Sequence, residues 1–342
     1  MNSISEVIVN TEQCKLIGRF LREKRKGYKY YMFDDPKENP DLSLGREIDA
    51  NYYGAVIDID HHFWRFSNGK LDIGDGTLVA DYGLLNGQRL KGATFLWVKS
   101  KMMLDKDSNF FSAKNLANLS KEMFESWLSD DSGEIPIFDP DTRLMLTRQL
   151  GRKLLERYNG NFDEIYEKSG HRLLWNGFLG GFLTRCEEFE GYRDPIFFKK
   201  ANLLAKVMER RGLWKFKDPE NKNPPINYHI PNIAYKTGMI VLPPPLMAKI
   251  REKTPLNEDD EFKLRLATVE AYRIVASESG IDPYKIDDDA WNESRKYCQE
   301  PPLNCDGVNE RRPCFWRDVC AAYNVKPELR QLTIPLVDTH RY

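Results

Sequence analysis

The sequence predicts a mainly α-helical protein with a small N-terminal β-sheet, which places it in the α+β class. Two stretches in the first third of the chain are rich in β-branched and aromatic residues, and each contains an Asn-Gly pair of the kind that turns a β-hairpin. From Asn115 onward apolar residues recur at intervals of three and four, as on one face of a helix. With 342 residues, 41% of them hydrophobic, the chain can form one large or two modest cores.

The N-terminal part is expected to begin with a helix around Glu6–Lys24. A polar, proline-containing surface loop should follow over residues 33–47. Strands are expected over residues 52–73, where an Asn-Gly pair marks the hairpin turn. Residues 78–99 repeat this pattern less cleanly around a second Asn-Gly pair, and strands are expected there too.

The rest of the chain is expected to be helical. Segments with helical apolar spacing are separated by Pro, Gly and Asn clusters, and they cover residues 114–130, 140–158, 161–185, 196–214, 242–253, 259–277 and 287–298. The sequence therefore predicts an N-terminal α+β part at 1–112, a helical part at 113–297, and a cysteine-containing loop and tail at 298–342.

The charge balance argues against a strongly basic nucleic-acid-binding protein. Lys and Arg total 51 against 52 for Asp and Glu, so the net charge of -1 gives no overall attraction to a polyanion. Binding to nucleic acid would need a local basic patch. No run of eighteen apolar residues is present, and the first thirty residues lack the pattern of a signal peptide. We expect a cytoplasmic monomer that does not enter a membrane.

Four cysteines crowd one stretch near the C-terminus, CQEPPLNCDGVNERRPCFWRDVC, with intervals of six, eight and five residues. Four thiolates so close together can surround one metal centre, and both tetrahedral zinc and a [4Fe-4S] cluster accept four cysteine ligands. A cytoplasmic location favours a metal over disulfides; free structural cysteines are the alternative. The predicted cofactor is a [4Fe-4S] cluster, or else Zn²⁺, and the predicted ligands are Cys298, Cys305, Cys314 and Cys320.

This loop resembles the iron-sulfur loop that closes DNA glycosylases of the endonuclease III type. The intervals there are six, two and five residues, so the first and last agree and the middle one does not. Three arginines lie between or beside the cysteines, Arg311, Arg312 and Arg317. They are expected to meet the phosphates of nucleic acid, or else to form a solvated basic edge.

Five segments of the chain resemble the motifs of one family in order and spacing. VIDIDHHFW is similar to a D-x-x-N-F-x-F-W strand, with Phe63 and Trp64 aligned, and FFKKANLL looks like a K-R-A-Q-I-L helix. The other three, INYHIPNIAYKTGMIVLPPPL, EFKLRLATVEA and KIDDDAW, resemble A-D-Y-R-V-P-Q with G-V-L, E-x-x-I-R-x-x-x-x-x-A-V-E, and I-D-x-x-L-W. The family is the queuosine salvage family of nucleotide N-glycosidases, and the resemblance runs from about Tyr52 to Trp291.

The resemblance implies a helical DNA-glycosylase-like architecture and cleavage of an N-glycosidic bond. Cleavage develops positive charge on the sugar and negative charge on the leaving base, so a carboxylate and a hydrogen-bond donor are needed. The family's catalytic aspartate falls on Asn227, which cannot supply that charge. Asp287 and Asp60 are the preferred replacements and Asp58 is a third. Each can instead be a turn or helix-capping residue.

The resemblance also implies residues that bind the substrate. Lys199 is expected to hold a phosphate or the base, unless it is a solvated charge. His61, His62 or His229 would donate to the leaving base. His61 and His62 are expected in a strand, where neighbours point to opposite faces, so at most one of the two should face the pocket. Tyr228 is expected to stack on the base.

Two tryptophans complete the predicted binding set. Trp64 and Trp291 are expected to stack on the base of the substrate, as aromatic side chains do on an extruded nucleobase. Core packing is the alternative for both.

Three functions stay open at this point. The preferred one is an N-glycosidase that removes a modified base from DNA, in repair or antiviral defence, because of the cysteine loop. The second is a queuosine 5′-phosphate N-glycosidase that salvages queuine. The third is a nucleic-acid or nucleotide binding protein without activity, which Asn227 favours. The expected partner is accordingly DNA with a modified base or a modified nucleotide.

Overall fold

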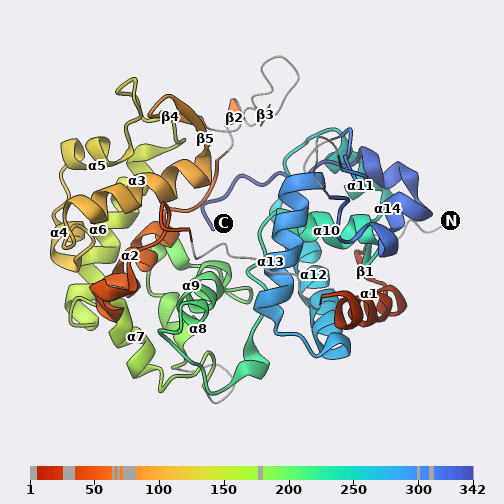
Figure 1. The fold of residues 1–342 in the computed structure, drawn as a ribbon, viewed down its shortest axis with the longest axis horizontal. Helices are drawn as coiled ribbons and strands as arrows, with labels where there is room; N and C mark the ends of the chain where they lie inside the picture. The colour runs from red at the N-terminus through yellow and green to blue at the C-terminus, as the bar shows by residue number, and fades with distance from the viewer. Residues whose placement is uncertain are drawn as a thin grey trace. The chain divides into compact units, whose positions relative to one another are not determined.

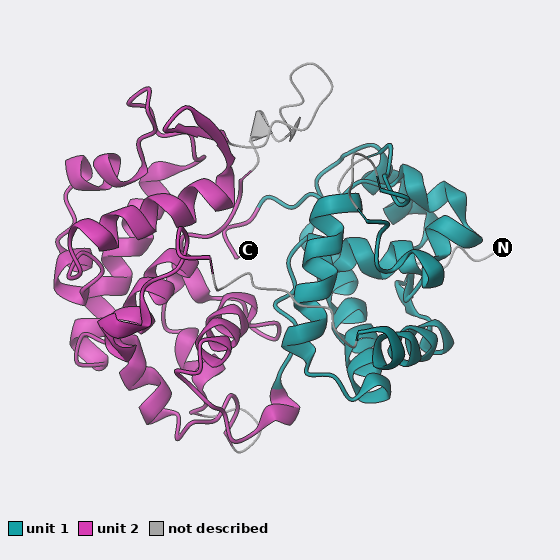
Figure 2. Cartoon of the chain, viewed as in Figure 1, with its two compact units in different colours: residues 1–30, 222–338 teal, residues 31–221, 339–342 magenta. Residues whose placement is uncertain are grey.

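The computed structural model shows two compact units (Figures 1 and 2). Unit 1 comprises residues 1–30 and 222–338, and unit 2 comprises residues 31–221 and 339–342. This division differs from the three consecutive parts expected from the sequence, because both ends of the chain return to distant segments. The structure describes residues 6–25, 35–63, 66–67, 70–71, 82–175, 180–298, 301–307 and 312–341.

The predicted class, mainly α with a small β part, is confirmed: the described residues form chiefly helices, with three two-stranded antiparallel sheets. The elements of unit 1 are β1 (Ile8–Val9), α1 (Thr11–Lys24), α10 (His229–Thr237), β6 (Ile240–Val241), α11 (Pro244–Arg251), α12 (Glu258–Ser279), α13 (Pro283–Glu293), a π turn (Ser294–Cys298), α14 (Ala321–Asn324), and short 3-10 turns at Arg317–Val319 and Pro327–Gln331.

Unit 1 joins the N-terminal helix to the C-terminal half of the chain. The side chain of Asn10 caps α1 by accepting from the backbone N–H of Gln13. The face of α1 that contains Ile17 and Leu21 is buried, and α1 packs along α12. Gly18 allows this close approach, because a Cβ there would lie 2.6 Å from Cβ of Glu278. β1 pairs with β6 beside these helices.

The elements of unit 2 are α2 (Arg46–Asp58), β2 (Phe66–Ser67), β3 (Lys70–Leu71), β4 (Tyr82–Leu85), β5 (Gln88–Lys91), α3 (Gly92–Lys106), α4 (Ala113–Ala117), α5 (Lys121–Leu128), α6 (Pro140–Arg157), α7 (Phe162–Lys168), α8 (Phe182–Cys186) and α9 (Lys199–Arg210), with 3-10 turns at Leu42–Leu44, Glu190–Tyr192 and Pro219–Asn221. Both predicted hairpins are present, as β2 with β3 and β4 with β5. The predicted helical segments 140–158, 196–214, 242–253 and 259–277 correspond to α6, α9, α11 and α12. Two other predicted segments are each divided: residues 114–130 correspond to α4 and α5, and residues 161–185 to α7 and α8, with non-helical backbone over residues 169–175.

Two predicted strands are helices instead. Residues 52–58 belong to α2, and residues 93–99 belong to α3. α2 contacts α3, α6, α7 and α9, and its second half is buried on every side. A helix surrounded in this way has no polar face, so its sequence loses the 3.6-residue period. Its β-branched and aromatic residues then resemble a buried strand.

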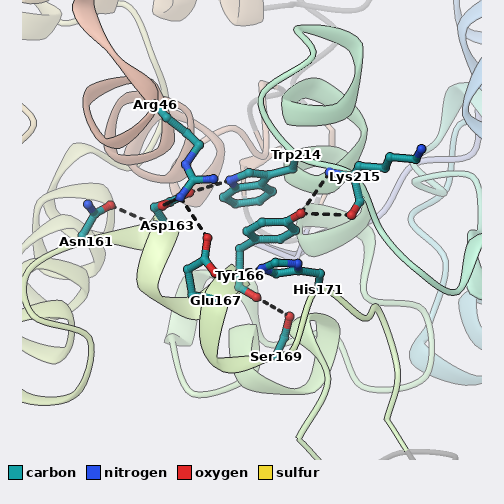
Figure 3. Close-up of polar contacts among 9 residues, drawn as sticks. All are labelled: Arg46, Asn161, Asp163, Tyr166, Glu167, Ser169, His171, Trp214 and Lys215. Atoms are coloured by element: carbon teal, nitrogen blue, oxygen red, sulfur yellow. Dashed lines mark hydrogen bonds and ion pairs between the residues drawn. The ribbon is translucent and has the colours of Figure 1, made fainter.

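A stack of three rings ties α7 to later segments of unit 2 (Figure 3). The ring of Tyr166 lies between those of His171 and Trp214, at centroid distances of 4.4 and 4.8 Å, with interplanar angles of 7° and 3°. The Tyr166 hydroxyl donates to the Lys215 carbonyl at 2.9 Å and accepts from the Lys215 N–H at 3.1 Å. The indole N–H of Trp214 donates to Asp163 at 2.7 Å. These bonds explain why the polar groups of the stack can be buried.

Candidate active site

A buried group of polar side chains surrounds Lys200 in unit 2. Lys200 is the second residue of α9, and its side chain is fully buried. Its Nζ lies 2.6 Å from the carbonyl oxygen of Asp58, 2.8 Å from the carbonyl oxygen of His340, and 3.2 Å from Nδ1 of His61. The lysine thus joins the end of α2, the start of α9 and the last residues of the chain.

These contacts indicate where the protons of the Lys200 group lie. A charged lysine has three donors and no acceptor, and the two carbonyl oxygens can only accept. When Lys200 is charged, its third donor goes to Nδ1 of His61, and the imidazole carries its own proton on Nε2. Nε2 of His61 is buried and has no hydrogen-bond partner among the described residues. Its N–H therefore remains available to another acceptor.

Burial controls the charge of this group. It raises the pKa of Asp58, and the nearby charge of Lys200 opposes the rise. Burial lowers the pKa of Lys200, and the charge of Asp58 opposes the fall. Burial, followed by the charges of Lys200 and Arg143, keeps the pKa of His61 well below its ordinary value. Asp58 and Lys200 therefore favour each other's charged form, while His61 stays neutral.

Arg143 of α6 holds the loop that follows α2. Its guanidinium donates to the carbonyl oxygen of Ile59, to that of His61 at 2.6 Å and to that of His62 at 3.2 Å. His62 has a φ of 51°, so the expectation that the two histidines lie in a strand is wrong. Both histidine side chains are buried, because the backbone curls around the guanidinium instead of running straight.

Asp60 and Lys199 flank this group. Burial and the charge of Asp58 have the largest influence on the pKa of Lys200. The charge of Lys199 lowers this pKa further and the charge of Asp60 raises it, so both residues act on the Lys200 ammonium. Lys199 is buried, which makes its alternative as a solvated charge wrong. Of the three candidate carboxylates, Asp58 is 0% and Asp287 is 3% exposed, whereas Asp60 is partly accessible to solvent.

A second group of predicted residues lies in unit 1 at the start of α10. Oδ1 of Asn227 accepts from the backbone N–H of His229 at 2.9 Å, so this side chain forms the turn that begins the helix. The ring of His229 lies 4.5 Å from that of Tyr228 and 6.0 Å from that of Trp291. Nδ1 of His229 is 3.1 Å from Oγ of Ser294. Three residues predicted to bind substrate are therefore neighbours.

Asp287 is in the middle of α13. The helix is capped by Asp282, so the helix-capping alternative is wrong for Asp287. It lies one turn before Trp291 and hence on the same helical face. Together with burial, the charge of Asp287 raises the pKa of Tyr272 on α12. Asp287 is thus an interior carboxylate of unit 1.

The predicted catalytic and binding residues are divided between the two units. Unit 2 contains Asp58, Asp60, His61 and Lys199, whereas unit 1 contains Asn227, Tyr228, His229, Asp287 and Trp291. Each set is assembled within its own unit, and a single cleft formed by both sets stays a prediction. Trp64 lies outside the described residues.

The four cysteines lie in unit 1 as buried free thiols. In the described part of the chain, no three His, Cys, Asp or Glu side chains are already set to hold a metal ion, so the cofactor stays a prediction. Of the arginines beside them, Arg312 pairs with Glu293 at 2.5 Å and Arg317 with Asp306 at 3.3 Å. Arg311 lies outside the described residues.

Lys200 lies in the family-like segment FFKKANLL but no role was predicted for it, and Arg143 was not identified from the sequence. A signal for Lys200 exists, because it shares one face of α9 with Leu204 and Val207, at helical intervals of four and seven residues. A lysine on an apolar face must find buried acceptors. Arg143 has no comparable signal, since its partners are backbone carbonyls whose position depends on the fold.

Comparison with known proteins identifies a family. Residues 84–281, more than half of the chain, match the family model described as queuosine salvage protein. The match includes Lys199 and Asn227, and it ends before Asp287 and the four cysteines. No curated protein matches the chain. None of the described helices has the length and apolar character needed to cross a membrane.

Proposed function

Because the chain belongs to the queuosine salvage protein family, we propose that it hydrolyses the N-glycosidic bond of a modified nucleotide, queuosine 5′-phosphate. The family match carries this proposal. It favours a free nucleotide over the modified base in DNA that the cysteine loop had suggested, since no feature of the match points to DNA.

The reaction transfers a ribosyl group to water. The bond between C1′ of the ribose and the nitrogen of the base breaks, and its electron pair stays with the base. The base gains a proton and leaves as queuine. The oxygen of a water molecule bonds to C1′ and yields ribose 5-phosphate, and the proton that water loses needs a base nearby. A carboxylate near C1′ both stabilises the sugar cation and accepts this proton.

In our proposal Asp60 is this carboxylate. It is partly accessible, whereas Asp58 and Asp287 are buried. It also belongs to the loop that Arg143 fixes through three carbonyl oxygens, and a fixed carboxylate stabilises a developing cation better than a mobile one. His61, next along this loop, has a buried Nε2 without a partner among the described residues. Its N–H is our candidate donor to the leaving base.

Asn227 supports a second candidate from another class. A member of this family with asparagine at the catalytic position can keep the nucleotide site without turnover. Such a protein would bind queuosine 5′-phosphate and release no base.

Incubation of the full chain with queuosine 5′-phosphate, and separately with DNA that contains a modified base, tests the proposal. Mass spectrometry should detect queuine and ribose 5-phosphate from the nucleotide and no free base from the DNA. Binding of the nucleotide without release would support the binder instead. Release from DNA alone would overturn the choice of substrate.

Variants of the loop test the assignment of residues. Asp60→Asn should reduce kcat by about 100-fold or more, the usual contribution of a positioned acid or base. Asp141→Asn is the matched control, because the Asp141 side chain is 85% exposed. If Asp287→Asn reduced kcat by the same factor while Asp60→Asn kept full activity, Asp287 of unit 1 would be the catalytic carboxylate instead.

A further inference from the structure

The four cysteines of unit 1 lie beyond residues 84–281, which the family match covers. Cys298 ends the π turn after α13, and Cys320 directly precedes α14. Between them, the backbone N–H of Cys314 donates to the carbonyl oxygen of Cys305 at 2.9 Å. All four thiols are buried. Three separate turns therefore bring them to one region of the unit.

Contacts connect the cysteines to one another and to α10. The side chains of Cys298 and Cys314 are hydrogen-bonded to each other. Sγ of Cys320 donates to the carbonyl oxygen of Lys236 at 3.3 Å. Because Cys314 also bonds to Cys305 through the backbone, the four cysteines lie in one region of the unit.

Lys236 provides a buried positive charge beside these sulfurs. Its side chain is 0% exposed, and its Nζ donates to the carbonyl oxygen of Cys298 at 2.5 Å. One turn earlier on α10, Asn232 donates to the same oxygen at 2.8 Å. Among the described residues, no carboxylate forms an ion pair with Lys236. A buried ammonium requires a nearby anion, and four neutral thiols would not supply one.

A second cation lies beside the loop. Arg330 donates to the carbonyl oxygen of Leu303 at 3.1 Å, on the segment between the first two cysteines. Lys236 and Arg330 thus give this region two positive charges.

We propose that Cys298, Cys305, Cys314 and Cys320 bind one tetrathiolate metal centre, a [4Fe-4S] cluster or Zn²⁺. Four thiolates around either core form a dianion, which is the counter-charge that Lys236 and Arg330 require. The sulfurs close up around the metal when it binds. The centre then links α13, α10 and α14, so its main effect is on the stability of unit 1.

Metal content of the full chain tests this directly. Protein purified without oxygen, from cells supplied with iron and zinc, is analysed for metals, acid-labile sulfide and visible absorption. Four iron with four sulfide per chain, or one zinc per chain, is the expected result, and the stoichiometry distinguishes the two. Folded protein with neither metal overturns the proposal. Because no substrate is used, the result is independent of the proposed glycosidase activity.

Variants locate the centre. Cys305→Ser and Cys314→Ser should lose most of the bound metal, while Cys14→Ser should retain it, since Cys14 is a buried cysteine of the same unit outside the loop. Lys236→Met should weaken metal binding by about 10- to 100-fold, as other changes around metal ligands do, in competition with a chelator. Wild-type metal content in both loop variants would overturn the proposal.

Discussion

Replacement of Lys200 by methionine tests the buried group at the centre of unit 2. Methionine keeps the length and apolar part of the side chain but removes its charge and its donors. The carbonyl oxygens of Asp58 and His340 and Nδ1 of His61 would each lose a hydrogen bond, at donor–acceptor distances of 2.6, 2.8 and 3.2 Å in the wild type. The carboxylate of Asp58, which is 0% exposed, would also lose the positive charge that opposes the rise in its pKa.

The expected loss of stability is at least about 3 kcal/mol, because the two carbonyl oxygens and the buried ring nitrogen each lose a donor, at about 1–3 kcal/mol for each group. Asp58→Asn alone should also destabilise the protein, because it leaves the ammonium without its counter-charge. The double variant removes both charges. Its loss should be smaller than the sum of the two single losses by at least about 1 kcal/mol.

Urea denaturation of the wild type, both single variants and the double variant measures this coupling through the free energy of unfolding. Lys121→Met is the matched control, since the Lys121 side chain is 62% exposed, and it should change stability by less than about 0.5 kcal/mol. Additivity within about 0.5 kcal/mol would refute the reasoning, because it would mean that the two charges do not stabilise each other.

Three further predictions concern unit 2. Gly191→Ala should destabilise the protein by about 1–3 kcal/mol in urea denaturation, because the new Cβ would lie 2.7 Å from Cγ and 2.8 Å from the carbonyl oxygen of Asp58; an unchanged midpoint would contradict this packing. Burial raises the pKa of the Glu187 carboxyl from 4.5 to about 7. Between these two pH values the carboxyl is protonated in the folded protein and ionised in the unfolded chain, so the folded protein loses stability as pH rises from about 4.5 through about 7. The Glu187→Gln variant has no carboxyl at this position and does not lose this stability. The difference between the Tm of the variant and the Tm of the wild type should therefore increase over this pH range and then level off. A difference that stays constant with pH would contradict the raised pKa of Glu187. Tyr166→Phe keeps the ring stack but removes both hydrogen bonds to Lys215, and it should lower the free energy of unfolding by about 1–3 kcal/mol; a change below about 0.5 kcal/mol would show that these bonds contribute little.

The amphipathic helices were predictable because they have one buried and one solvated face. In α9 the apolar positions recur at helical intervals, and the sequence alone predicts the helix. The two hairpins were predictable for a similar reason, since an Asn-Gly pair is a local turn signal. The second half of α2 was not, because burial removes the pattern on which such prediction depends. The first half of α3 was also missed, since its β-branched and aromatic residues resemble a strand.

The candidate site divides in the same way. The sequence offered Asp58, Asp60, His61 and Lys199 as candidates through their family-like motifs, and the cysteines as candidate ligands through their spacing. It could not identify Arg143, whose partners are three backbone carbonyl oxygens of a distant loop. It also predicted the wrong backbone geometry for His61 and His62, because the same residue types are compatible with a strand and with a curled loop.

The sequence by itself determined the helical class, the hairpins, the motif series of the family and the four crowded cysteines, because each depends on spacing along the chain. Only the tertiary structure decided which charges are buried, and with which partners. Lys200 and Lys236 are ordinary lysines in the sequence, yet each lies in the interior of its unit. Their surroundings are formed by segments far apart in the chain, and the free energy of a buried charge depends on those surroundings rather than on its neighbours in sequence.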